Sequence, residues 1–328
     1  MKKVQQKFSS WRRSHREMRS LAAAVAAGPR HALALLVPQR AVAWTYADLD
    51  VKARRLASGL QGSGYGLQSI ALAADANSPE DTLLLQIAAA HVGAAVATPP
   101  TSDSALRSLS AKYDVRGTVC SEQIADFVER CEPRELAPVA DETTCAGVFG
   151  GAAITHDTVM RLGRSAQAKL QITGADVVCC ASTLLHSFGI GSAVASTLGA
   201  GACVVLPAPE GAPPTGHGDA ASATLDALAA TRSTLLFADT GTLEAMRRVE
   251  APAALALRGG VIKISSGADF LLDVVDVAAS GGDAEEETGP RLPLELGGVQ
   301  LTAMGRRAFW IGKATTQAHR VSSTSSVI

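Results

Sequence analysis

The sequence has no Asp, Glu, Lys or Arg between Val177 and Pro209. Such a stretch is the most solvent-averse part of the chain, and we expect it at the centre of a domain. It is long enough to span a membrane, but several glycines, Ser and Thr residues and His186 interrupt it. We therefore interpret it as a small-residue helix over 190–198 and a buried strand over 203–206, and expect no transmembrane helix.

The six cysteines show neither C-x-x-C spacing nor a histidine at metal-ligand spacing. Neither a zinc site nor a disulfide framework is supported, so we expect a reducing compartment and no bound metal. The chain also lacks an overall charge bias, since 30 basic residues stand against 31 acidic residues among 328. Net charge therefore gives no indication of nucleic-acid binding.

Positive charge is nevertheless concentrated at the start of the chain. Residues 1–19 carry seven basic side chains, several serines and the single acid Glu17. This composition is typical of organelle-targeting segments and, equally, of a solvated basic helix. Within the N-terminal arm, residues 1–30, we expect the basic segment Met1–Arg19 to contact protein, RNA or an anionic lipid surface. The predicted location is mitochondrial, in the matrix or on the matrix side of the inner membrane.

Strand and helix patterns alternate through most of the remaining chain. Helices are predicted over 46–60, 79–92, 157–170 and 220–230, and strands over 70–74, 93–98, 176–181, 233–238 and 261–265. This alternation is typical of an α/β domain with doubly wound, mostly parallel sheets. We assign residues 31–312 to this domain and residues 313–328 to a polar tail.

Several short motifs resemble, in the same order, those of the adenylate-forming acyl-CoA synthetases. They are Trp44-Thr45-Tyr46, Asn77-Ser78-Pro79-Glu80, Gly93-Ala94, Ile154-Thr155-His156, Leu185-His186-Ser187-Phe188-Gly189 and Ser266-Gly267-Ala268. The resemblance covers about residues 43–270 and implies the fold of the N-terminal domain of these enzymes. It also implies their chemistry, in which ATP and Mg²⁺ activate a carboxylic acid to an acyl-adenylate that usually passes to coenzyme A.

The resemblance places the family's phosphate loop on residues 143–151. Gly147 and Gly151 match the family, but its Pro and Lys correspond to Phe149 and Gly150. A phosphate cradle needs backbone N–H groups, hydroxyls and a cation. We expect this loop to keep only its backbone.

By the same resemblance, Thr155, His186 and Gly267 would line a vestigial pocket together with Gly147 and Gly151. From the residues alone, Thr155 also fits a helix start, and His186 fits a hydrogen-bonded core histidine. We predict no catalytic residue and no cofactor, with vestigial binding of ATP or coenzyme A as an open alternative.

Later family motifs are not found. Residues 271–290 contain no Tyr-Gly-x-Thr-Glu, the ribose-binding Asp aligns only with Lys313, and too few residues follow for the family's C-terminal domain. Each lost charge-stabilising contact is worth about 10²–10³ in rate. We therefore expect no competent adenylation.

The combined hypothesis is a catalytically inactive acyl-CoA synthetase-like protein that serves as a structural accessory subunit of a large mitochondrial assembly. A respiratory complex is the first expectation and the mitochondrial ribosome the second. Two alternatives stay open: a non-catalytic acyl- or nucleotide-binding module, and an ATP-dependent carboxylate–CoA ligase completed by another chain.

Overall fold

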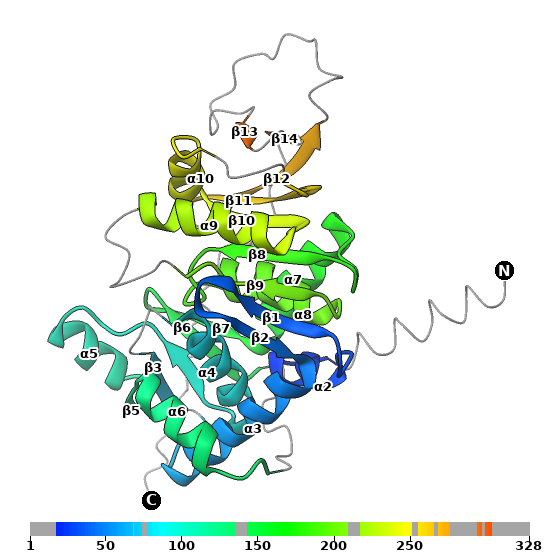
Figure 1. Cartoon of the computed structure of the whole chain (residues 1–328). Helices are drawn as coiled ribbons and strands as arrows, with labels where there is room; N and C mark the ends of the chain where they lie inside the picture. The colour runs from blue at the N-terminus through cyan, green and yellow to red at the C-terminus, as the bar shows by residue number, and fades with distance from the viewer. Residues whose placement is uncertain are drawn as a thin grey trace, which may run out of the picture.

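Two β-sheets layered with helices form the folded part of the chain (Figure 1). The structure is a computed structural model, and it describes residues 18–67, 69–73, 78–134, 143–208, 217–250, 255–265, 268–275, 294–296 and 299–303. Parallel strand pairs dominate the centre of both sheets. The predicted α/β fold with mostly parallel sheets is therefore confirmed.

The larger sheet consists, in spatial order, of β13 (Leu294–Leu296), β14 (Val299–Ala303), β12 (Ala268–Val275), β11 (Gly259–Ser265), β10 (Leu235–Asp239), β8 (Val177–Ala181), β9 (Cys203–Val205), β1 (Leu33–Val37) and β2 (Val42–Thr45). Its central strands, β11, β10, β8, β9 and β1, are parallel. The outer strands β2, β12, β13 and β14 pair antiparallel. Between β1 and β2 lies the short 3-10 helix η1 (Pro38–Arg40).

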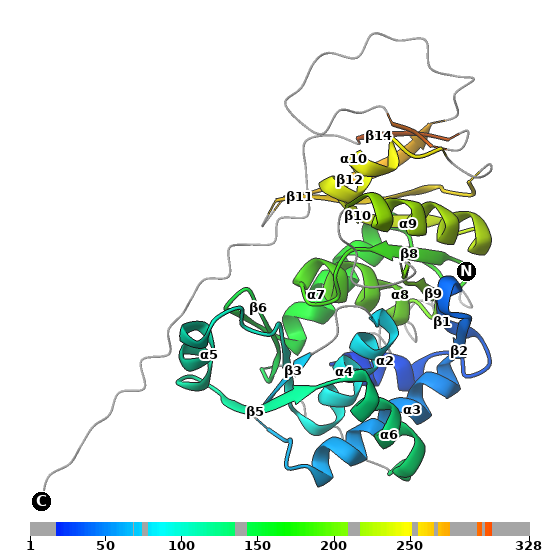
Figure 2. The same ribbon diagram turned by 60° about the vertical axis from the view of Figure 1, so that its left-hand side comes forward.

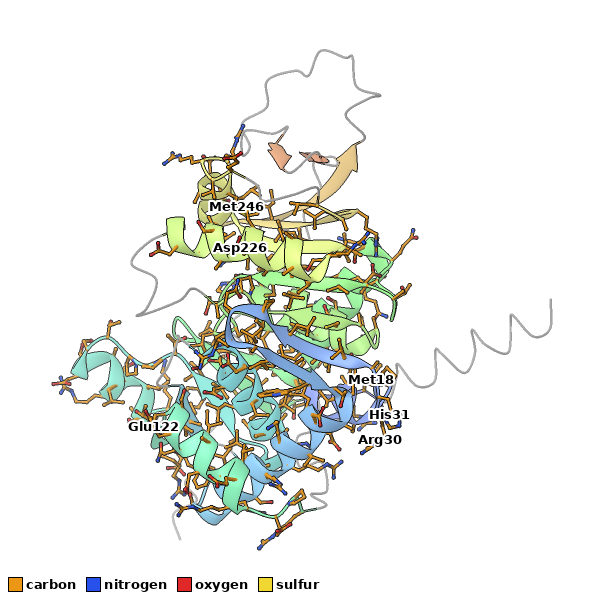
Figure 3. All side chains as sticks on the ribbon, in the orientation of Figure 1. Met18, Arg30, His31, Glu122, Asp226 and Met246 are labelled. Carbon is orange, nitrogen blue, oxygen red and sulfur yellow. The ribbon has the colours of Figure 1, made fainter. Side chains whose placement is uncertain are left out.

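Both faces of the larger sheet are buried, because successive residues of each central strand enter different hydrophobic clusters. Val178 and Cys180 pack with α7 (His156–Leu170), the π-helix η2 (Phe188–Ala195) and α8 (Ser196–Gly199). Cys179 packs on the opposite face with α9 (His217–Thr231) and α10 (Thr240–Met246). In Figure 3, Met246 on α10 and Asp226 on α9 lie beside the larger sheet, far from Glu122. The apolar runs of these strands follow from burial on both faces.

The smaller sheet has the order β5 (Asp114–Val119), β3 (Ser69–Ala73), β4 (Ala95–Ala97), β6 (Cys145–Phe149) and β7 (Ala152–Thr155). All its neighbouring strands are parallel except β6 and β7. In Figures 1 and 2, α3 (Tyr46–Gly62), α4 (Pro79–Val92) and α6 (Ser121–Arg130) lie together beside this sheet, while α5 (Asp103–Ser110) stands apart from them. Leu109 of α5 packs against the cluster of Ile70 and Val148, so helices cover this sheet on both faces as well.

The folded unit begins earlier than residue 30, where the sequence places the end of the arm. Helix α2 (Leu21–Ala27) buries Leu21, Ala24 and Val25 in the main core and contacts α3, α4 and α8. Ser20 caps it by accepting a hydrogen bond from the Ala23 N–H. The basic residues before Met18 and the predicted tail over 313–328 lie outside the described residues.

The uncharged central stretch forms the predicted helix and strand, with the helix built from η2 and α8 and the strand being β9. Small residues let η2 approach α7 closely. A Cβ at Gly163 would meet the Ala195 backbone at 2.8 Å, and one at Gly191 would meet a Leu162 methyl at 2.9 Å. Within the described ranges, no helix combines the length and the hydropathy needed to cross a bilayer.

Candidate functional site

The residues expected to form a phosphate loop form a β-hairpin instead. Strand β6 runs to Phe149, β7 starts at Ala152, and these two residues pair directly. The connection is Gly150-Gly151, with φ of +56° and +82°. Two consecutive residues with positive φ are typical of a type I′ hairpin turn. Most of the stretch to which the resemblance assigns the family's phosphate loop is therefore strand, and its connection is a two-residue turn.

The backbone of β6 is engaged in sheet pairing on both sides. Gly147 lies opposite Val96 of the parallel strand β4 and opposite Ile154 of the antiparallel strand β7. Residues within a sheet use their N–H and C=O groups in the ladders to their neighbours. The backbone groups that the sequence analysis left for phosphate binding are therefore committed to the sheet along β6.

Thr155 begins helix α7. Its Oγ1 accepts a hydrogen bond from the Thr158 N–H over 3.2 Å, which is an N-cap. The next residue, His156, is buried, and its N–H donates to the Thr144 carbonyl over 3.1 Å. Gly151 has no atom within 4 Å of where a Cβ would stand, so it is needed for its backbone conformation. The N-cap of Thr155 and the turn conformation of Gly151 are structural roles.

His186 lies elsewhere, at the carboxyl edge of the larger sheet, in the loop between β8 and η2. Its Nδ1 accepts a hydrogen bond from the Phe188 N–H over 3.0 Å, and its Nε2 lies 3.1 Å from Lys263 Nζ. Burial, followed by the charge of Lys263, lowers the pKa of His186. The same loop is fixed from the smaller sheet's side, because Gln86 of α4 donates to the Leu184 carbonyl over 2.7 Å.

Lys263 is a site residue that the sequence analysis did not identify. It stands near the carboxyl end of β11, beside Asp239 of β10 in the parallel register. The one signal in the sequence is a lysine inside the apolar run from Val261 to Ile264, just before Ser265. Carboxyl ends of parallel strands are where α/β folds bind ligands, so His186 and Lys263 form the candidate site.

The other expected site residues are not brought to this pair by any hydrogen bond among the described residues. Gly147, Gly151 and Thr155 belong to the hairpin and the start of α7. Gly267 lies outside the described residues. Two aromatic rings that could fill a pocket are both buried in the main core: Phe149, and Phe188, whose ring centroid lies 5.9 Å from that of Phe237.

No family model and no curated protein matches this sequence. Solved structures do match its fold. ATP-bound MatB from Rhodopseudomonas palustris aligns with a TM-score of 0.59 and 16% identity, over 74% of this chain and 54% of that chain. The inhibitor-bound N-terminal domain of FACL13 from Mycobacterium tuberculosis aligns with a TM-score of 0.57 and 16% identity, over 76% and 77% of the two chains. The N-terminal subdomain of Klebsiella oxytoca NpsA, bound to anthranilyl-AMSN, aligns with a TM-score of 0.58 and 15% identity, over 86% and 80%.

These structures carry the N-terminal domain of the adenylate-forming acyl-CoA synthetase superfamily. The chain has the fold of this domain. The expectation of an adenylate-forming ligase fold, made from the order of short motifs, is thereby confirmed. The likeness at these identities concerns the fold, and the chain spans about half the length of MatB.

Proposed function

We propose that this chain is a catalytically inactive protein of the adenylate-forming ligase fold and an accessory subunit of a large mitochondrial assembly, with a respiratory complex as the first candidate and the mitochondrial ribosome as the second. The observation that carries the loss of catalysis is the Gly150-Gly151 turn between β6 and β7. A triphosphate cradle needs several converging N–H groups and a cation. A two-residue turn of glycines supplies neither the run of free N–H groups nor the charge.

The size of the effect favours inactivity over slow catalysis. Loss of one preorganised donor or cation that stabilises the reacting phosphate costs about 10²–10³ in rate. Here the hairpin replaces the loop as a whole, so several contributions are lost together. Such contributions are not additive, so their joint loss is not the simple product of the single losses, but it exceeds the cost of losing one.

The rest of the fold supports a structural role. The central strands of the larger sheet are buried on both faces, so the scaffold is complete without a nucleotide loop. A strongly basic segment precedes it in the sequence, with seven basic side chains against one acid over residues 1–19. A stable scaffold joined to a charged arm suits attachment to a larger assembly.

The catalytic part of the proposal is tested with the full-length chain, Mg²⁺-ATP and a panel of carboxylic acids. The measurements are ATP–pyrophosphate exchange and ATP binding by calorimetry, with an active ligase of the same fold as the positive control. We expect neither exchange nor binding. Binding without exchange would favour the binding module, and exchange that appears only with a second chain would favour a ligase completed by that chain.

A graft variant asks whether the hairpin is the cause of inactivity. A Ser/Thr/Gly-rich segment containing Pro-Lys-Gly replaces Gly150-Gly151, and an equally long Gly/Ser segment serves as the matched control. ATP binding by the first graft but not by the second would show that the loop alone was limiting.

The assembly part is tested in gently solubilised cells. Endogenous protein is followed on native gels and by mass spectrometry, and we expect it to migrate with a large complex. A variant in which the basic residues of 1–19 are changed to Gln tests the arm. We expect this variant no longer to migrate with the complex. Migration of the unaltered protein alone, near its own mass of 33.6 kDa, would reject the accessory role.

A further inference from the structure

Two exposed apolar side chains lie around the start of helix α3. Leu33 of β1 is 44% exposed and Val51 of α3 is 37% exposed. Leu33 lies opposite Thr45, the residue that precedes α3, in the antiparallel register of β1 and β2. Val51 stands one helical turn after Ala47, whose N–H donates to the Arg30 carbonyl over 3.0 Å. Both side chains therefore border the junction between β2 and α3.

An aromatic ring and two basic side chains stand at the same junction. Lys52 Nζ lies 5.0 Å from the centroid of the Trp44 ring, and Arg30 is exposed. We call the surface formed by Arg30, Leu33, Trp44, Val51 and Lys52 the entry face. Indole rings and long basic side chains combine an apolar part with a polar end, and for this reason they are found at the boundary between water and lipid.

Positive charge dominates this part of the chain. Residues 1–55 hold twelve of the 30 Lys and Arg residues but three of the 31 acids. Asp50 is buried and pairs with Arg54 over 2.9 Å. Asp48 is exposed, but Lys52 lies one helical turn away and offsets its charge. The entry face is therefore basic as well as apolar.

The basic arm joins the folded unit beside this face. In Figure 3, Met18 lies close to Arg30 and His31. Positive charge alone suits an acidic protein, RNA or an anionic membrane. The exposed side chains of Leu33 and Val51 distinguish among them. RNA is bound mainly through its phosphates, and the cores of protein interfaces are depleted of Lys. The headgroup region of a bilayer accepts apolar and basic side chains together.

We propose that the entry face binds the surface of an anionic membrane. Leu33 and Val51 enter the boundary between headgroups and acyl chains, and Arg30 and Lys52 face the anionic headgroups. The ring of Trp44 lies at the same level. The arm adds long-range attraction, which brings the face to the membrane. This surface depends neither on the loss of catalysis nor on the accessory role, so each proposal can fail alone.

The test is co-sedimentation of the full-length chain with vesicles of phosphatidylcholine, with and without phosphatidylserine. We expect binding to the anionic vesicles, weakened by added salt. Arg30→Gln with Lys52→Gln should lower the partition coefficient about 20-fold, since each basic side chain near such a surface contributes about five-fold. The matched control is Arg107→Gln with Lys112→Gln, two exposed positions on and just after α5. Figure 1 shows α5 across the molecule from α2, so this control should leave binding unchanged.

A second pair of variants separates apolar insertion from charge. Leu33→Ser with Val51→Ser should lower the partition coefficient about ten-fold, because less apolar surface leaves water. The dependence of binding on salt should stay as in the unaltered protein, whereas the Gln variants should reduce it. Leu67→Ser with Leu106→Ser is the matched control, since these side chains are 60% and 38% exposed elsewhere on the molecule. Equal losses in the control and in the entry-face variants would reject the proposal.

Trp44 reports whether the face itself meets the bilayer or only the arm does. With Trp11→Phe and Trp310→Phe it is the one tryptophan left in the chain. We expect lipids brominated near the headgroup to quench its fluorescence when the protein binds. Vesicle binding without quenching would assign the contact to the arm alone and overturn the proposal. Equally strong binding to uncharged vesicles would also overturn it, as would RNA binding, weakened by the Gln variants of the entry face, in a protein that does not bind vesicles.

Discussion

The ring of Phe149 lies against the backbone of Gly147. A Cβ at Gly147 would stand 2.5 Å from the ring carbon Cζ and 2.9 Å from the Val96 carbonyl oxygen. Residues two apart in a strand share one face of the sheet, so the ring folds back along β6. The aromatic side chain thus fills the space beside the one residue of this strand that has no side chain.

Gly147→Ala should therefore destabilise the protein, by about 1–3 kcal/mol, because overpacking forces the ring or the strand to shift. Urea denaturation followed by circular dichroism measures the change. Gly62→Ala is the matched control, since Gly62 ends helix α3 and has no atom within 4 Å of the new Cβ. It should be neutral or stabilising by up to about 1 kcal/mol. A Phe149→Leu change should recover part of the loss in Gly147→Ala, and strict additivity would contradict the packing argument.

The two-residue turn gives a second prediction, which concerns the backbone alone. Neither Gly150 nor Gly151 has an atom within 4 Å of where a Cβ would stand, so a new side chain meets no clash. Gly150→Val should cost about 1–2 kcal/mol, because a β-branched residue is strained at positive φ. Gly150→Asn should cost well under about 1 kcal/mol, because Asn-Gly is a favoured type I′ turn. Equal free energies of unfolding for the two variants would show that the turn is not type I′.

The sequence was informative where local rules coincide with the fold. It failed where the resemblance was given more weight than a local turn signal, and where segments distant in the sequence meet. Helix α4 was predicted with its observed bounds, because Pro79 occupies its first turn and Gly93, with φ of +76°, ends it. The hairpin was missed because the resemblance places a phosphate loop of the family's length on residues 143–151, although Gly-Gly between apolar runs is itself a hairpin signal. The pair of His186 and Lys263 was missed for another reason. These residues meet only through the strand order β8, β10 and β11, which periodicity does not reveal.

His91 of α4 gives the chain a pH-dependent stability. Its side chain is buried, and within the described part of the chain its Nε2 has no hydrogen-bond partner. Burial, followed by the charge of Arg54, lowers the pKa of His91 from 6.5 to about 4. As the pH falls, the unfolded chain therefore takes up a proton on His91 at a higher pH than the folded chain does. The stability that depends on the neutral imidazole is fully present above pH 6.5 and is lost as the pH falls to about 4. The free energy of unfolding should fall by about 2 kcal/mol between pH 7.5 and pH 5.

The measurement is urea denaturation at several pH values in the unaltered protein and in His91→Gln, which removes the titrating group. Burial raises the pKa of Glu80, and this carboxyl acts in the opposite direction, so the difference between the two proteins isolates His91. His31→Gln, at an exposed imidazole, controls for loss of a histidine. Identical pH slopes in the unaltered protein and His91→Gln would contradict the prediction.

Asp176 joins the amino ends of three strands of the larger sheet. It precedes β8, while Thr234 precedes β10 and Arg258 precedes β11. Arg258 Nε donates to Asp176 Oδ1 over 2.8 Å and Arg258 Nη2 donates to Oδ2 over 2.9 Å, while Thr234 Oγ1 donates to Oδ1 over 2.8 Å. Burial alone would raise the pKa of Asp176. The hydrogen bonds from Arg258 and then from the Thr173 N–H outweigh burial, so the pKa of Asp176 is lowered. The carboxylate form is therefore the one that holds the strands together.

Asp176→Asn should accordingly cost about 2–3 kcal/mol, below the full cost of breaking a buried pair because the Arg258 side chain is 42% exposed. Asp114→Asn is the matched control, since the pair of Asp114 and Arg116 is exposed on both sides and such pairs contribute at most about 1 kcal/mol. Denaturation in urea with and without 1 M NaCl separates the two cases, because salt screens the exposed pair and leaves the buried one largely intact. The lowered pKa means that this stabilisation is present above the carboxyl's ordinary range and is lost as the pH falls through its folded value. If Asp176→Asn cost no more than Asp114→Asn, the three strands would be held by their ladders and their apolar faces, and the carboxylate would only occupy the space between them.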